Sequence, residues 1–137
     1  MKELPNSDHA LLVRTDFSDE SAWTRICAEI EAPVGEFRAY VTFVSDRESE
    51  GLAIDELTEL GKRGPYRTFL FVIDRESVQD PEHPILVLDL AEEPGRTFRV
   101  VPREMWSVEN NLSMANMDFS EFAENTDADG VFQGFGA

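Results

Sequence analysis

Three aspartates are the residues in this sequence best placed to do chemistry, because Asp16, Asp46 and Asp74 each closely follow a short apolar run. Ligands of parallel α/β sheets bind outside the carboxyl ends of the strands, so these carboxylates could gather on one rim. Such oxygen ligands suit Mg²⁺ and phosphate chemistry, and Arg14 or Arg75 could clamp an anionic substrate. The alternative is that each aspartate only caps the turn that follows its strand.

The rest of the catalytic inventory is small. The chain has two lysines and neither a GxxxxGK[ST] nor a GxGxxG motif for a phosphate. Neither histidine, His9 or His83, lies in a motif that pairs it with a nucleophile. Cys27 falls in an apolar helical pattern that predicts a buried thiol, and we expect His83 to bond a loop carbonyl or carboxylate. A Ser/His or Cys/His mechanism is therefore disfavoured.

A calcium loop is suggested by the segment 125–130, NTDADG, which matches alternate ligand positions and the glycine of such a loop. The pattern then fails, because the twelfth position, where a bidentate glutamate is expected, is Gly136. A turn rich in aspartate and glycine explains the same residues.

The segment 106–122, WSVENNLSMANMDFSEF, crowds large apolar residues around three asparagines. We regard Trp106, Asn110, Asn111 and Asn116 as candidate binding residues, because binding residues concentrate on loops. The alternative is that the asparagines tie the connection between two helices to the sheet, since buried amides need hydrogen-bond partners.

Net charge is the strongest compositional signal, with 28 acidic residues against 12 basic ones, a formal charge of −16. Such a surface repels nucleic-acid backbones and anionic membranes, so we expect neither as a partner. The charge either only confers solubility or docks the domain onto a basic protein by electrostatic steering. The candidate acids for that surface are Asp19, Glu20, Glu48, Glu50, Asp55, Glu56 and Glu59.

Hydrophobic periodicity predicts five strands, at 10–14, 37–44, 66–73, 85–90 and 97–101. It predicts helices at 19–31 with Ser18 as the cap, at 52–60, at 103–112, and from Phe119 onward. The region 74–84 reads as a surface loop. The order β-α-β-α-β-β-β-α-α predicts a single α/β domain with a mixed five-stranded sheet, whose first three strands are parallel and whose last two add an antiparallel element.

A chain of 137 residues is long enough for one domain with its own core. No window approaches the run of about 18 apolar residues that a membrane span needs, and the N-terminus lacks the apolar run of a signal peptide. We therefore expect a cytoplasmic protein. Residues 1–9 are expected to be flexible, and the aromatic side chains of the Gly/Phe-containing tail, 124–137, suggest that it docks on the domain.

The pieces LLVRTDFSDESAW, DPEHPILVLDL, EEPGRTFRVVP and WSVENNLSMANMDFSEFA resemble a family of short bacterial proteins known as a domain of unknown function. The resemblance covers nearly the whole chain and implies no activity, cofactor or catalytic residue. We interpret the chain as a non-enzymatic protein-binding or inhibitor-like domain that needs no cofactor, with a basic protein as the possible partner. The alternative is a divalent-metal-dependent enzyme acting on a phosphate-containing or other anionic substrate, with Mg²⁺ at the three strand-end aspartates. The oligomeric state stays open.

Overall fold

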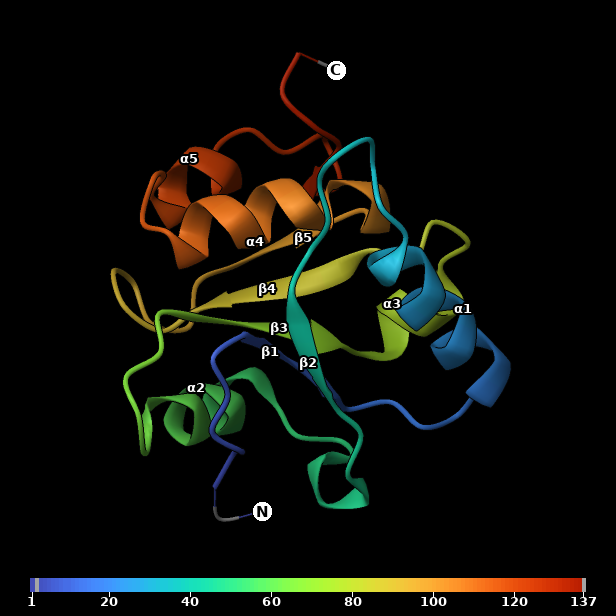
Figure 1. The fold of residues 1–137 in the computed structure, drawn as a ribbon. Helices are drawn as coiled ribbons and strands as arrows, with labels where there is room; N and C mark the ends of the chain where they lie inside the picture. Colours follow the sequence, from blue (N-terminus) through green and yellow to red (C-terminus); the bar gives the residue numbers. More distant parts are fainter. Residues whose placement is uncertain (2, 137) are drawn as a thin grey trace.

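The computed structural model describes residues 1 and 3–136, which form a single α/β domain around a mixed six-stranded sheet (Figure 1). The strand order is β2-β1-β3-β4-β5-β6. Strands β1, β2 and β3 are parallel, β4 is antiparallel to both of its neighbours, and β6 is parallel to β5. The strands are β1 (Ala10–Arg14), β2 (Val41–Val44), β3 (Phe69–Ile73), β4 (Ile85–Asp89), β5 (Thr97–Val100) and β6 (Val131–Phe132).

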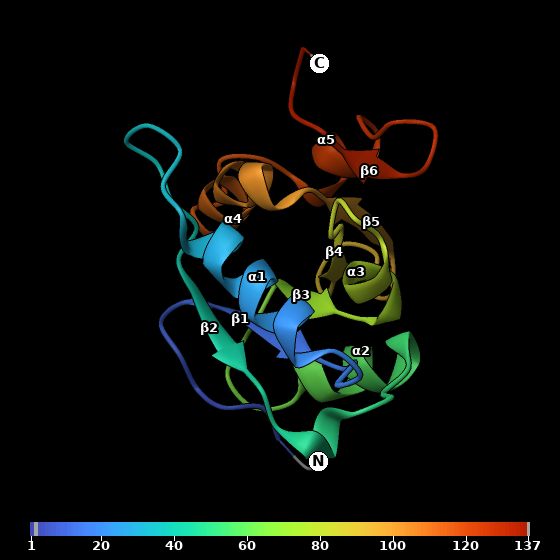
Figure 2. The same ribbon diagram turned by 90° about the vertical axis from the view of Figure 1, so that its right-hand side faces the viewer.

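Helices cover both faces of the sheet (Figures 1 and 2). Those that pack on one face are α1 (Glu20–Glu31), α4 (Met105–Ser113) and α5 (Phe119–Ala123). On the other face α2 (Ile54–Lys62) packs together with Leu4 of the N-terminal segment. The short helix α3 (Arg75–Gln79) follows β3, and single 3₁₀ turns lie at Arg47–Ser49 (η1) and Pro102–Glu104 (η2). No helix in the described part of the chain is long and apolar enough to cross a membrane.

The central strands form because their sequences are nearly continuous in apolar residues, as strands buried on both faces must be. All five residues of β3 and all five of β4 are buried. Their side chains alternate between two clusters, one beneath α1, α4 and α5 and the other beneath α2. The predicted α/β class, the parallel first three strands and the antiparallel addition are confirmed.

The sheet has six strands where the sequence predicts five, because the C-terminal tail contributes β6. Its two residues are too few to show a periodic pattern, but Phe132 is fully buried and packs against Phe122 with ring centroids 5.2 Å apart. The prediction that 74–84 is a loop was also wrong, because this region contains the short helix α3, which Asp74 caps. The docking of the tail is confirmed.

Several element boundaries differ from the prediction; β3 begins at Phe69 and not at residue 66, and α2 spans Ile54–Lys62 and not 52–60. The cap of α1 is Asp19 and not Ser18, because the Asp19 carboxylate accepts the backbone N–H of Ala22 at 3.0 Å. The strand predicted over 37–44 begins only at Val41, since the chain first makes a tight hairpin turn. In that turn Gly35 adopts a φ of +62°, which glycine tolerates without strain.

Replacing Phe132 by alanine should lower the free energy of unfolding by about 3–5 kcal/mol, because a fully buried ring leaves a cavity in the core. Phe135 lies three residues later, and its side chain is 52% exposed. Phe135→Ala should therefore cost less than about 1 kcal/mol. Urea unfolding followed by circular dichroism measures both variants, and equal losses would contradict the docking of the tail.

Candidate functional site

The three strand-end aspartates follow parallel strands that end at the same edge of the sheet, and each carboxylate already has local bonds. The Asp16 carboxylate accepts the backbone N–H and the hydroxyl of Ser18, at 2.9 and 2.5 Å. The Asp46 carboxylate accepts the backbone N–H of Glu48 at 2.9 Å and so caps η1. These are the bonds expected of aspartates that cap the structure after a strand.

Asp74 forms a strong ion pair. Its two carboxylate oxygens receive Nη1 and Nη2 of Arg99, from β5, at 2.9 and 2.7 Å, and it also caps α3 through Ser77. Burial alone would raise the pKa of Asp74, but the hydrogen bonds and charge of Arg99 outweigh it and lower the pKa. Arg99 also pairs with Glu76 at 2.8 Å.

Metal binding at this rim would have to compete with these bonds. Within residues 1 and 3–136 there is no group of three or more His, Cys, Asp or Glu side chains that could hold a metal ion. The crevice between β1 and β3, where parallel sheets often bind ligands, is bridged by the backbone. Thr15 and Asp16 both donate their N–H groups to the Ile73 carbonyl, at 2.9 and 3.3 Å.

Arg14 is buried among aromatic rings and is not a free anion clamp. Its guanidinium lies between Phe17 and Trp23, at 4.3 and 4.6 Å from the ring centroids. It bonds both carboxylate oxygens of Glu20, at 3.4 and 2.8 Å, and these bonds lower the pKa of Glu20. The sequence offered only a weak signal for this pair, a lone arginine at the end of an apolar strand. Arg75, the other candidate clamp, is exposed on α3.

Of the four candidate binding residues in α4 and just after it, the side chains of three make contacts within the domain and that of the fourth, Asn116, is exposed. Trp106 stacks on Phe37 of the hairpin with centroids 4.5 Å apart, and its Nε1 is buried without a hydrogen-bond partner in the described part of the chain. Asn110 donates to the Arg38 carbonyl at 3.1 Å, which ties α4 to the segment leading into β2. The amide of Asn111 donates to Ser107 of its own helix at 2.8 Å. Asn116 is exposed in the α4–α5 connection.

Glu109 is a structural residue that the sequence interpretation missed. Its side chain is buried, and its Oε1 accepts the Tyr40 backbone N–H at 2.7 Å and the Asn110 amide at 3.0 Å. The signal was available, because Glu109 lies four residues after Met105 and so on the inward face of the predicted helix. Together Glu109 and Asn110 hold the start of β2 against α4.

The remaining candidates for chemistry are His83, Cys27 and the calcium-like segment 125–130, and their side chains are either hydrogen-bonded within the domain or unreactive. The Nδ1 atom of His83 lies 2.8 Å from the Ser77 carbonyl, as expected for a loop histidine. Burial raises the pKa of Cys27 to about 11, so its thiol is protonated at neutral pH. The calcium-like segment forms a turn, in which the Asp127 carboxylate accepts the backbone N–H groups of Asp129 and Val131, each at 2.9 Å. Gly130, with φ of +79°, completes that turn.

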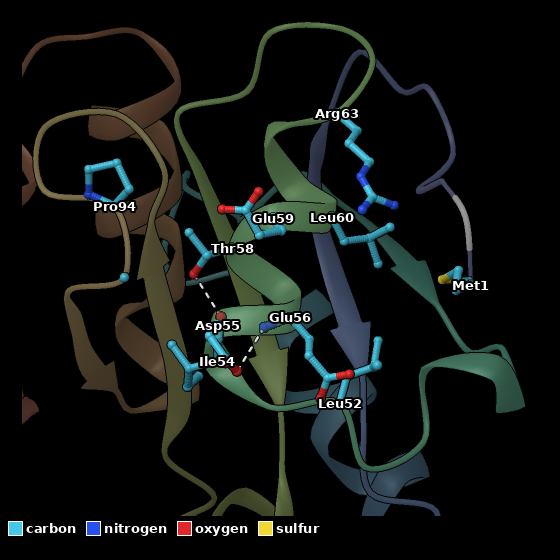
Figure 3. A pocket seen from close by; sticks show the side chains of 11 residues that line it. Met1, Leu52, Ile54, Asp55, Glu56, Thr58, Glu59, Leu60, Arg63 and Pro94 are labelled. Carbon is cyan, nitrogen blue, oxygen red and sulfur yellow. Dashed lines mark hydrogen bonds between the residues drawn. The ribbon is translucent and has the colours of Figure 1, made fainter.

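An open groove of about 770 Å³ runs along α2 (Figure 3). One wall is α2 itself, and Pro94 of the β4–β5 turn lies across from it. The lining residues are Met1, Leu52, Ile54, Asp55, Glu56, Thr58, Glu59, Leu60, Arg63, Pro94 and Gly95.

Three exposed carboxylates of α2, Asp55, Glu56 and Glu59, give this groove its negative character. Asp55 accepts the Glu56 N–H, and the Glu56 side chain accepts the Ala53 N–H, both at 3.0 Å. None of the three is ion-paired with a basic side chain in the described residues. Among the lining residues that the structure describes, Arg63, at the end of α2, is the one basic side chain.

The other acids proposed from the sequence do not join this groove. Asp19 caps α1, and Glu20 is bound to Arg14. Glu50 pairs with Arg47 at 3.3 Å, and Glu48 pairs with the amino group of Met1 at 3.5 Å.

The fold is a small α/β domain with a mixed sheet, and no catalytic constellation is assembled in the residues described. The sequence matches the family described as Domain of unknown function (DUF6924) over residues 9–135, nearly the whole chain. The protein therefore belongs to the DUF6924 family. No curated protein matches the sequence.

Asp74→Asn should lower the free energy of unfolding at pH 7 by about 1–3 kcal/mol, because the largely buried Arg99 guanidinium loses its bidentate carboxylate and keeps only the pair with the more exposed Glu76. The folded pKa of Asp74 is lowered, so the stabilisation is fully present above its unfolded pKa of about 3.9. It is lost as the pH falls through the folded pKa. The difference between wild type and variant, from urea unfolding, should therefore shrink as the pH is lowered below about 4.

Asp46→Asn is the matched control, because Asn caps as well as Asp and the Asp46 carboxylate is not ion-paired in the described residues. It should change the free energy of unfolding by less than about 0.5 kcal/mol at either pH. A loss as large as that of Asp74→Asn would mean that the Arg99 ion pair is not the stabilising element.

Proposed function

We propose that this domain is a non-enzymatic binding protein that captures a basic segment of another protein in the groove along α2. The observation that carries the proposal is the set of exposed carboxylates on α2, Asp55, Glu56 and Glu59, which border the groove without an ion pair in the described residues. Carboxylates that a fold needs for stability are usually bonded within it, as Asp74 is. On α2, Asp55 and Glu56 accept backbone N–H groups, but none of the three carboxylates is neutralised by a basic side chain in the described residues.

The apolar part of the groove specifies the segment further. Leu52 and Ile54 are only partly buried, and Pro94 and Gly95 on the opposite wall are exposed. A lysine or arginine can lay its methylene stem along such a surface while its charge reaches a carboxylate. An amphipathic basic segment therefore fits better than a purely polar one.

The charge of the whole domain supports the same partner. A formal charge of −16 produces a negative potential that raises the association rate of a basic ligand. The attraction is screened over a Debye length of about 10 Å at 0.1 M salt. Binding to the α2 groove should therefore weaken with added salt.

The test uses a fluorescein-labelled amphipathic peptide of lysine and leucine as the probe, with fluorescence anisotropy as the readout. The triple variant Asp55→Asn, Glu56→Gln, Glu59→Gln should raise Kd about tenfold, since each exposed charge pair contributes about 0.2–1 kcal/mol. Gln retains the capping role at position 56. The variant should also show a smaller change of Kd with salt than the wild type.

The matched control removes the same number of charges on the opposite side of the sheet, with Glu29→Gln, Glu31→Gln and Glu36→Gln, all exposed positions. Its Kd should rise less than about threefold, because only the screened long-range field changes. Equal weakening by the two triple variants would show that net charge alone attracts the peptide. Failure of the wild type to bind at low salt would also contradict the proposal.

A further inference from the structure

The outer edge of β2 has no strand paired to it, because β2 is the terminal strand on one side of the sheet. Figure 2 shows the N-terminal segment beside this strand, where Ser7 bonds the Thr42 hydroxyl at 2.6 Å and the His9 ring lies 5.9 Å from the Tyr40 ring. At the other end β6 has only two residues. The backbone groups on the outer side of β2 have no strand partner in the described residues, and such a row is a template for another strand.

β2 is short, with four residues, but several other features that block pairing at an edge are missing from it. Soluble proteins protect edge strands with lysine, proline, bulges or inward-pointing charges. The stretch 40–44, YVTFV, contains none of these residues. The Tyr40 side chain is 48% exposed, and Val41 and Phe43 are partly exposed.

We propose that this edge pairs with the β2 edge of a second copy of the chain, antiparallel and with the two-fold axis at Thr42. In that register Thr42 lies opposite its own copy, and Val41 lies opposite Phe43 on the same side of the sheet. The Val41–Phe43 pairs join an aromatic to a β-branched residue, a combination that stabilises antiparallel strands. The Thr42 hydroxyl keeps its bond to the Ser7 hydroxyl at 2.6 Å. The two sheets would then form one continuous sheet through a symmetric interface.

Charge complementarity selects this partner. Arg38 and Asp46 lie four residues on either side of Thr42 and just outside β2, so each would face the other in the second copy where the extended pairing continues past Val41–Val44. Arg38 lies over the ring of its own Tyr40 at 5.2 Å, and the Asp46 carboxylate accepts only the Glu48 N–H. Neither side chain has an ion pair in the described part of its own chain. An in-register parallel pair of β2 strands would instead place Arg38 beside the Arg38 of the second copy and Asp46 beside its Asp46.

Salt distinguishes this association from capture of a basic segment. Two chains of formal charge −16 repel each other at long range, and added salt screens that repulsion more than it screens the short contacts at the edge. Dimerisation through β2 should therefore strengthen between low and moderate salt, whereas binding of a basic peptide at α2 weakens. The two proposals can thus fail independently.

The register is tested by oxidative cross-linking of Thr42→Cys in a Cys27→Ser chain, because a symmetric cross-strand pair brings the two Cβ atoms within disulfide range. Thr24→Cys, exposed on α1, is the matched control. We expect a covalent dimer from the first variant and a monomer from the second. Equal cross-linking, or none in either chain, would overturn the proposed register.

Sedimentation equilibrium of the wild type and of charge variants tests the interface without a cross-link. Arg38→Asp and Asp46→Arg should each weaken dimerisation about tenfold, because each places like charges opposite one another. The double variant should restore it to within about threefold of the wild type. A wild type that stays monomeric over a range of salt, or a dimer unaffected by either single variant, would overturn the proposal.

Discussion

Burial of both faces of β1, β3 and β4 is the constraint on which the rest of the structure depends. Strands with no polar face must be covered on both sides, so α1, α4 and α5 lie on one face and α2 on the other. The sheet can then meet another molecule only at its ends and its edges. Among the surfaces that this covering leaves exposed are the outer side of α2 and the outer edge of β2, the two that we propose as binding surfaces.

The carboxyl ends of the strands serve stability in this protein. Two arginines, Arg14 and Arg99, lie with their guanidinium groups largely out of water, and an unpaired buried charge is very costly. Glu20 and Asp74 neutralise them, and aromatic rings enclose Arg14. The rim that binds ligands in many α/β proteins is therefore occupied by internal ion pairs, caps and a backbone bridge to Ile73.

The sequence was informative where a pattern is long and uninformative where it is short. The central strands are apolar runs, so their existence and direction could be predicted, as could the main helices, whereas their order in the sheet could not. Helix α3 is a single turn and β6 has two residues, so neither shows periodicity. The partners of Arg14, Glu109 and Arg99 lie up to 69 residues away along the chain. Such contacts depend on the three-dimensional arrangement and leave little trace in local spacing.

The charges of α2 are only partly explained by the stability of the helix. Asp55 and Glu56 lie in its first turn, where acids interact favourably with the helix dipole, and Glu56 bonds the Ala53 N–H. Glu59 has neither advantage, and it stands four residues after Asp55, a like-charge spacing that destabilises a helix by about 0.2–0.5 kcal/mol. A lysine at this position would make a favourable pair with Asp55. Glu59 also stands three residues before Lys62, an acid-to-base spacing that stabilises a helix by a similar amount, so the repulsion from Asp55 is offset within α2.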